Sequence, residues 1–148
     1  MIRLNLYIIL LLAYSIVTFA QNEKFIQNFK TGSKTDSNFI VISEIEQSIK
    51  NADVIKLARF INSKTYFSLM GNVNGYYTTN QAFYLLEDFF KVYRVQSFRF
   101  NQINSYENNP YATGIFYYEN KGRRSKAQVY VSLKRIGENW IISQLSIN

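Results

Sequence analysis

The sequence predicts an α+β domain in which helices pack on one face of a curved antiparallel sheet. In residues 38–62 and 82–90, apolar residues recur at three- and four-residue steps, the period of amphipathic helices. From Ser97 onward the period changes to two, as in half-buried strands. Aromatic residues make up 17% of the chain and there is a single proline, a composition that favours a well-packed sheet.

The first twenty residues have the order of a secretory signal peptide. Arg3 supplies a positive start, an almost uninterrupted apolar run follows, and Thr18-Phe19-Ala20 ends in small residues. Cleavage is therefore predicted between Ala20 and Gln21. The alternative is a retained membrane anchor, but this apolar run is at the short edge of the roughly 20 residues that cross a bilayer. We expect an exported protein, periplasmic or extracellular, with no membrane span after cleavage.

The part after the cleavage site divides into a leader and a domain. Residues 21–37 are mostly polar and are predicted to form a flexible leader. Residues 38–148 have the length of a single domain. The predicted mature chain keeps 16 basic and 10 acidic residues, because cleavage removes only Arg3 from the 17 basic ones.

Three N-terminal helices are predicted. Residues 38–62 carry two apolar stripes with a break at Asn51-Ala52-Asp53, where Asp53 can cap the second helix. Thr78-Thr79-Asn80-Gln81 has the form of a capping box that opens the third helix. The three apolar stripes consist of Phe39, Ile42, Ile45 and Ile49; of Val54, Leu57, Ala58 and Ile61; and of Ala82, Leu85, Leu86, Phe89 and Phe90.

A short hairpin is predicted between the second and third helices. Residues 65–70 form its first strand, Asn74-Gly75 suits a tight turn, and Tyr76-Tyr77 begins the return. Four longer strands follow the third helix, and short turns join them, so an antiparallel meander is the simplest arrangement. The first of these strands begins at Ser97. The other three cover residues 111–119, 127–133 and 140–147.

This order of elements is similar to the cone-shaped nuclear transport factor 2-like, or cystatin-like, fold. More closely, the chain resembles the domain of unknown function 4783 family of exported Bacteroidota proteins over about residues 39–148. The resemblance is carried by Ile49-Lys50-Asn51-Ala52 with Leu57 and Phe60, Tyr77-Thr78-Thr79-Asn80-Gln81-Ala82, Leu86-Glu87-Asp88-Phe89-Phe90, Ser97-Phe98, Tyr111-Ala112-Thr113-Gly114, Val129-Tyr130-Val131-Ser132-Leu133-Lys134 and Trp140-Ile141-Ile142-Ser143-Gln144-Leu145-Ser146-Ile147.

The resemblance implies a small envelope protein and no particular reaction, because the function of that family is unassigned. Its matching pieces are packing and turn patterns rather than catalytic motifs. Members of the family carry a histidine on the strand after the third helix, where this chain reads Phe100-Asn101-Gln102-Ile103. No role of that histidine can be transferred to this chain.

The composition removes several classes of chemistry. The sequence has no cysteine and no histidine, which excludes disulfides, thiolate nucleophiles, serine–histidine triads and most zinc sites. No phosphate-binding glycine loop and no calcium-loop spacing are present. We therefore expect no cofactor and no metal. The net charge of +7 is compatible with an anionic partner, but export argues against nucleic acid, and a modest charge for solubility is the simpler explanation.

A lone carboxylate could still act as a general acid or base in a pocket between helices and sheet, where desolvation raises its pKa. Asp88 comes nearest to this pattern, since it adjoins Phe89 and Phe90. However, its spacing fits the edge of the apolar stripe, and Lys91 at i+3 offers a surface partner. Asp88 is a weak catalytic candidate, and a solvated position explains it more simply.

Two groups of residues are candidates for binding. Arg123, Arg124 and Lys126 belong to a dense basic run that could hold phosphate or a carboxylated glycan, or could simply keep a hairpin tip soluble. Tyr130 stands on the polar face of its strand, where Tyr117 or Tyr111 could join it. Tyrosines on an open sheet face suit a dimer contact, glycan stacking or ordinary cross-strand packing.

Our leading hypothesis is a non-enzymatic ligand-binding or protein-interaction module of the cell envelope. Its partner would be a small apolar ligand, an envelope glycan or a protein, with a homodimer through the open sheet face as one form. The two alternatives are a pocket enzyme that uses a lone carboxylate and a structural envelope component.

Overall fold

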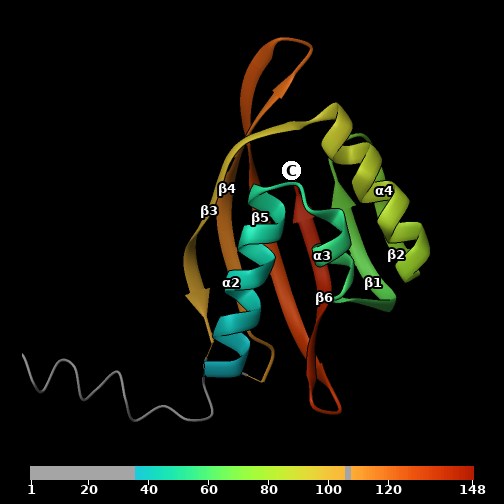
Figure 1. Ribbon diagram of the computed structural model, residues 1–148, viewed down its shortest axis with the longest axis vertical. Coiled ribbons are helices and arrows are strands. Elements are labelled where there is room, and N and C mark those ends of the chain that lie inside the picture. The colour runs from blue at the N-terminus through green and yellow to red at the C-terminus, as the bar shows by residue number, and fades with distance from the viewer. Residues whose placement is uncertain (1–35, 106–107) are drawn as a thin grey trace, which may run out of the picture. The chain divides into compact units, whose positions relative to one another are not determined.

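The computed structural model describes residues 36–105 and 108–148 (Figure 1). The predicted signal peptide, its cleavage site at Ala20 and Gln21, and most of the predicted leader lie outside the described residues. Asp36 and Ser37, which the sequence placed in the leader, are the first residues of a helix. The compact unit runs from Ser37 to Asn148.

Three helices and six strands make up this unit. In chain order they are α2 (Asp36–Lys50), α3 (Val54–Ala58), β1 (Ile61–Leu69), β2 (Val73–Tyr77), α4 (Thr79–Val92), β3 (Arg94–Asn104), β4 (Tyr111–Asn120), β5 (Arg123–Ile136) and β6 (Asn139–Ile147). Two helices, a hairpin, a third helix and four strands follow one another as predicted, but the three helices do not all precede the sheet. The hairpin strands β1 and β2 join the same six-stranded sheet as the later strands, so α4 is inserted after its first two strands.

The sheet has the order β2-β1-β6-β5-β4-β3. Four of the neighbouring pairs are antiparallel, as predicted, but β1 and β6 run parallel. The prediction of a wholly antiparallel sheet was wrong here because the last strand inserts between β5 and β1. Long-range bonds hold this pair: Met70 N donates to Ile147 O at 2.9 Å, and Thr65 Oγ1 donates to Ile142 O at 3.0 Å.

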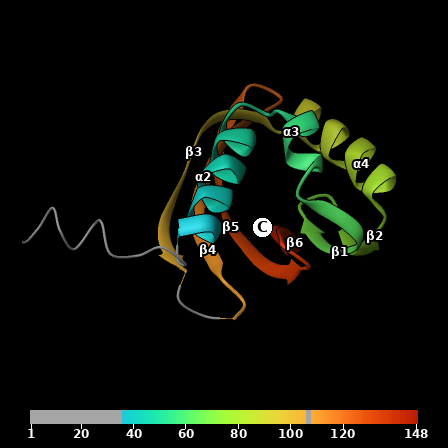
Figure 2. The same ribbon diagram turned by 60° about the horizontal axis from the view of Figure 1, so that its bottom comes forward.

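All three helices lie on one face of the curved sheet (Figures 1 and 2). In both views α2 runs beside β3 and β4, and α4 runs beside β1 and β2. The Glu46 carboxylate of α2 accepts a hydrogen bond from Phe100 N of β3 at 2.8 Å, which fixes the helix against the edge strand. The opposite, outer face carries none of the described helices.

Apolar side chains fill the space between helices and sheet. Among the described residues, the only buried polar side chains are Asn38, Ser48 and Thr65. The alternating apolar residues predicted for β5 all face this core. The largest fully buried side chains are Phe67, Phe116, Ile42, Ile45, Ile49, Leu57, Leu86, Leu133, Ile142, Leu145, Ile147 and Val129. The interior of the described part is thus a packed, mostly apolar core.

Both predicted helix starts are confirmed. Asp53 caps α3 by accepting a hydrogen bond from Lys56 N at 3.0 Å, and this bond is the main cause that lowers the pKa of Asp53. Thr78 and Gln81 form the complete capping box of α4. The second helix is shorter than predicted, however: it ends at Ala58, and Ile61, assigned from the sequence to a helical stripe, begins strand β1.

The capping box gives a first testable expectation. Thr78→Ala should lower the free energy of unfolding by about 1 kcal/mol, because the Thr78 hydroxyl accepts from Gln81 N. Urea unfolding followed by circular dichroism measures this change. Thr78→Ser keeps the acceptor and should stay near the parent value; an equal loss in both variants would show that the methyl group matters rather than the cap.

Candidate functional site

The weak catalytic candidate does not lie in a desolvated pocket. The Asp88 side chain is 78% exposed and its carboxylate lies 3.6 Å from Lys91 Nζ, the surface partner that the sequence indicated. Of the carboxylates in the described part of the chain whose burial is given, none is buried. The residues described also contain no group of three metal-ligating side chains, and none of their helices is long and apolar enough to cross a membrane.

The dense basic run forms the tip of the β4–β5 hairpin. Lys121 and Gly122 make the turn with φ of 49° and 76°, so a left-handed turn connects the two strands. Residues 121–126 are all exposed. Within β5 the strand alternation separates the three basic candidates, because Arg124 and Lys126 share one face and Arg123 points to the other.

The outer sheet face brings together two of the predicted tyrosines. Tyr111 of β4 lies beside Ser132, and Tyr130 of β5 lies beside Thr113, so the tyrosines are diagonal neighbours. Their rings stack at 5.9 Å with an angle of 25° between the planes. Tyr117 is six residues farther along β4, about 20 Å away, and is 48% exposed. The three candidates therefore share one face but form two separate groups.

Two adjoining depressions lie between these groups on the outer face. The first, of about 460 Å³, includes Tyr117 and Arg99; the second, of about 330 Å³, includes Tyr130 and Gln128. They share Asn101 and Ile115 in their linings, so they adjoin. We call this combined feature the outer trough and define it by the side chains of Ser97, Arg99, Asn101, Thr113, Ile115, Tyr117, Gln128, Tyr130, Ser146 and Asn148.

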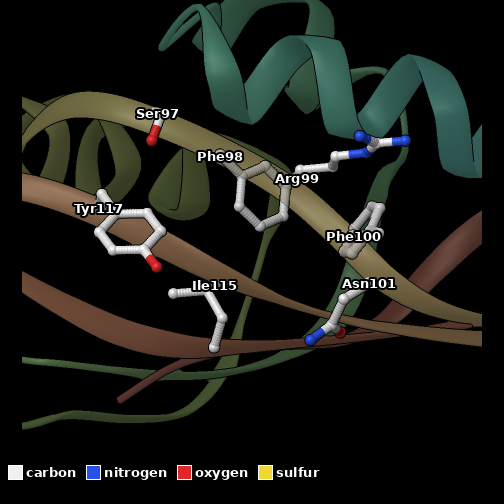
Figure 3. Close-up of a pocket in the computed structure, with 7 residues that line it drawn as sticks. All are labelled: Ser97, Phe98, Arg99, Phe100, Asn101, Ile115 and Tyr117. Atoms are coloured by element: carbon white, nitrogen blue, oxygen red, sulfur yellow. The ribbon is translucent and has the colours of Figure 1, made fainter.

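A bulge in the edge strand shapes the trough. Phe100 pairs with Gly114 and Gln102 with Thr113, which leaves Asn101 as the extra residue. Thr113 Oγ1 donates to Asn101 Oδ1 at 3.3 Å and so orients the amide. Figure 3 shows Asn101, Ile115 and Tyr117 along the same side of the β3–β4 pair. The close approach of β3 to β4 at Gly114 keeps Asn101 next to Ile115.

The trough has a defined chemical character. Two tyrosine rings and Ile115 supply apolar surface, while amides and hydroxyls from four strands and the C-terminal Asn148 supply hydrogen-bonding groups. Arg99 is the charged side chain of its lining, and no carboxylate side chain belongs to it. Such a surface can stack against and hydrogen-bond a neutral or anionic ligand.

The sequence identified only the tyrosines of this trough. Thr113 and Ile115 lie at two-residue steps between Tyr111 and Tyr117 on β4, so the same period-two rule could have found them. Arg99 and Asn101 alternate with the buried Phe98 and Phe100, so the same rule places them on the outer face. Which residues of β4 they lie beside depends on the β3 register, which has two irregularities.

Comparison with known proteins identifies the family. The family model described as "Domain of unknown function (DUF4783)" matches residues 42–148. The chain belongs to this family. Comparison with curated proteins gave no significant match.

Solved structures confirm the fold. A DUF4783 family protein from Bacteroides uniformis superposes with a TM-score of 0.65 at 17% identity, over 72% of this chain and 94% of that one. A DUF4783 family protein from Bacteroides ovatus has a TM-score of 0.62 and 17% identity, over 70% of this chain and 90% of that one. A ketosteroid isomerase-like protein from Erwinia carotovora atroseptica has a TM-score of 0.64 and 8% identity, over 78% of this chain and 95% of that one. The DUF4783 chain described here therefore has a nuclear transport factor 2-like fold, and identities this low show nothing more.

Proposed function

We propose that this DUF4783 protein is an exported, non-enzymatic binding module of the cell envelope, and that its ligand is a glycan held in the outer trough. The observation that carries the proposal is the combination of Tyr117, Ile115 and Tyr130 with amides and hydroxyls in two adjoining depressions. Sugar rings present apolar faces and polar edges, and they match a surface that offers aromatic faces beside hydrogen-bonding groups. Export rests on the signal-peptide pattern of residues 1–20.

Two features favour a glycan over a copy of the same chain as the occupant. The cores of protein interfaces are depleted in serine and lysine. The outer face has many such residues, since Ser97, Lys126 and Ser132 lie among its tyrosines. The trough is also concave, which suits a ligand of limited width.

The interior argues against the enzymatic alternative. A general acid in an apolar pocket needs a buried carboxylate with a raised pKa. The side chains between helices and sheet are instead apolar, and Asp88 lies at the surface beside Lys91. The ketosteroid isomerase-like neighbour has the same fold, but a shared fold does not imply a shared activity.

Tyrosine substitutions in the trough test the proposed function. Tyr117→Ala and Tyr130→Ala should each weaken glycan binding at least tenfold, because each removes an aromatic stacking surface. Binding is measured by calorimetry against neutral and acidic hexasaccharides of several backbones. Tyr84→Ala is the matched control, since Tyr84 is 65% exposed on α4, away from the trough, and it should bind like the parent.

Two results would contradict the proposal. One is the absence of binding to every hexasaccharide tested. The other is an equal loss of binding in the Tyr84→Ala control, which would mean that the loss is not specific to the tyrosines of the trough. A tight dimer that Tyr117→Ala converts to a monomer would assign the face to self-association instead.

A further inference from the structure

We infer that the glycan is anionic, a carboxylated or sulfated polysaccharide whose chain runs from the trough along β5 toward the β4–β5 hairpin tip. This inference rests on the proposed function and names the substrate class of the same surface. It starts from the cross-strand register, which places a line of cations beside the aromatic residues of the trough.

Cross-strand partners in a sheet project from the same face. In the sheet register, Arg99, Ile115 and Gln128 are cross-strand neighbours on β3, β4 and β5. Two residues nearer the hairpin tip, Tyr117 of β4 pairs with Lys126 of β5. Two residues farther along β5, Arg124 lies on the same face. Every second residue from Tyr130 to Arg124 therefore faces outward, and these residues change from aromatic to amide to cationic toward the tip.

The charge balance of this line is positive. Arg99, Lys126 and Arg124 contribute three cations, and Arg94 adds a fourth at the start of β3. Glu119 is the carboxylate in the same rows, and its cross-strand neighbours are Arg94 and Arg124. Lys126 and Arg124 are exposed, so their side chains can reach a ligand. An anionic ligand gains attraction here that a neutral one lacks.

The length of the line indicates a polymer rather than a single ion. From Arg124 to Tyr130 there are six residue steps, which span about 20 Å at 3.3 Å per residue. A free phosphate or a monosaccharide would contact only one end. An acidic oligosaccharide can place sugar rings on Tyr130 and Tyr117 and, at the same time, carboxylates near Lys126 and Arg124.

A pair of hexasaccharides that differ only in charge tests the inference. The probes are hexagalacturonic acid and its fully methyl-esterified form, with binding measured by calorimetry on the purified protein. We expect the acid to bind about tenfold more tightly than the ester in low salt, and this advantage should shrink as NaCl screens the charges. Arg124→Gln/Lys126→Gln should remove the advantage and leave binding of the ester unchanged.

The matched control removes the same charge elsewhere. Lys50→Gln/Arg59→Gln neutralises one lysine and one arginine that are exposed on the helical layer, and it should keep the preference for the acid. Melting curves for both double variants should overlay, because all four side chains are at the surface. An inorganic polyphosphate of equal charge should displace the acid poorly, since it has no sugar rings to lie on the tyrosines.

The outcomes separate this inference from the proposed function. If acid and ester bind equally and the Tyr117→Ala loss persists, the ligand is a neutral glycan, and the inference is wrong while the proposed function stands. If the polyphosphate competes equally, the surface is a general polyanion patch and the inference is also wrong. If no hexasaccharide binds, both fail.

Discussion

Gly114→Ala is expected to lower the free energy of unfolding by about 2–3 kcal/mol, the cost of inserting a methyl group where no space exists. A Cβ at Gly114 would lie 2.4 Å from the Arg99 carbonyl oxygen and 3.0 Å from Phe100 Cα. Both neighbours are backbone atoms, so a side-chain rotation cannot relieve the contact. The edge strand β3 would have to move away from β4.

The same substitution should disturb the trough. Phe100 pairs with Gly114, and the bulge that follows presents Asn101 beside Ile115. A displaced β3 carries Arg99 and Asn101 with it, so Gly114→Ala should weaken glycan binding as well as stability. Thermal melting and calorimetry measure the two effects on the same sample.

A turn glycine supplies the control. Gly122 has a φ of 76°, and a Cβ there would meet no atom within 4 Å. Asparagine tolerates this left-handed conformation, so Gly122→Asn should melt close to the parent protein. A Gly114→Ala variant as stable as Gly122→Asn would contradict the close approach of the two strands.

The parts of the fold that depend on local chemistry could be predicted from the sequence. The capping box at Thr78 and Gln81, the cap at Asp53 and the alternation along β5 each involve residues within a few positions of one another. The stacked Tyr111 and Tyr130 could be anticipated for a similar reason, because one short hairpin connects their strands.

Long-range pairing could not be predicted in this way. Ile61 continues a helical stripe in the sequence, yet it begins β1, which pairs with β6 more than seventy residues later. The parallel direction of that pair depends on the path of all the elements between β1 and β6, which no local sequence pattern indicates. The bulges of β3 likewise follow from its contact with β4. The alternation with Phe98 and Phe100 indicates the outer face for Arg99 and Asn101, but not which residues of β4 lie beside them.

Two adjacent residues of β4 should separate stability from binding. Phe116 is fully buried, and its ring lies 6.0 Å from that of Phe89 and 5.6 Å from that of Tyr118. Phe116→Ala should therefore cost about 3–5 kcal/mol, because it removes a large apolar side chain and leaves a cavity. Urea unfolding measures this loss, and Phe116→Leu should recover a large part of it.

Tyr117 is the next residue and points to the opposite face of the sheet. Since its side chain is 48% exposed, Tyr117→Ala should change the unfolding free energy by less than about 1 kcal/mol while it abolishes most of the glycan affinity. Unfolding of the two variants under identical conditions checks the contrast. If Tyr117→Ala destabilised the protein as strongly as Phe116→Ala, its loss of binding would reflect unfolding, and the outer trough would lose its main support as a binding surface.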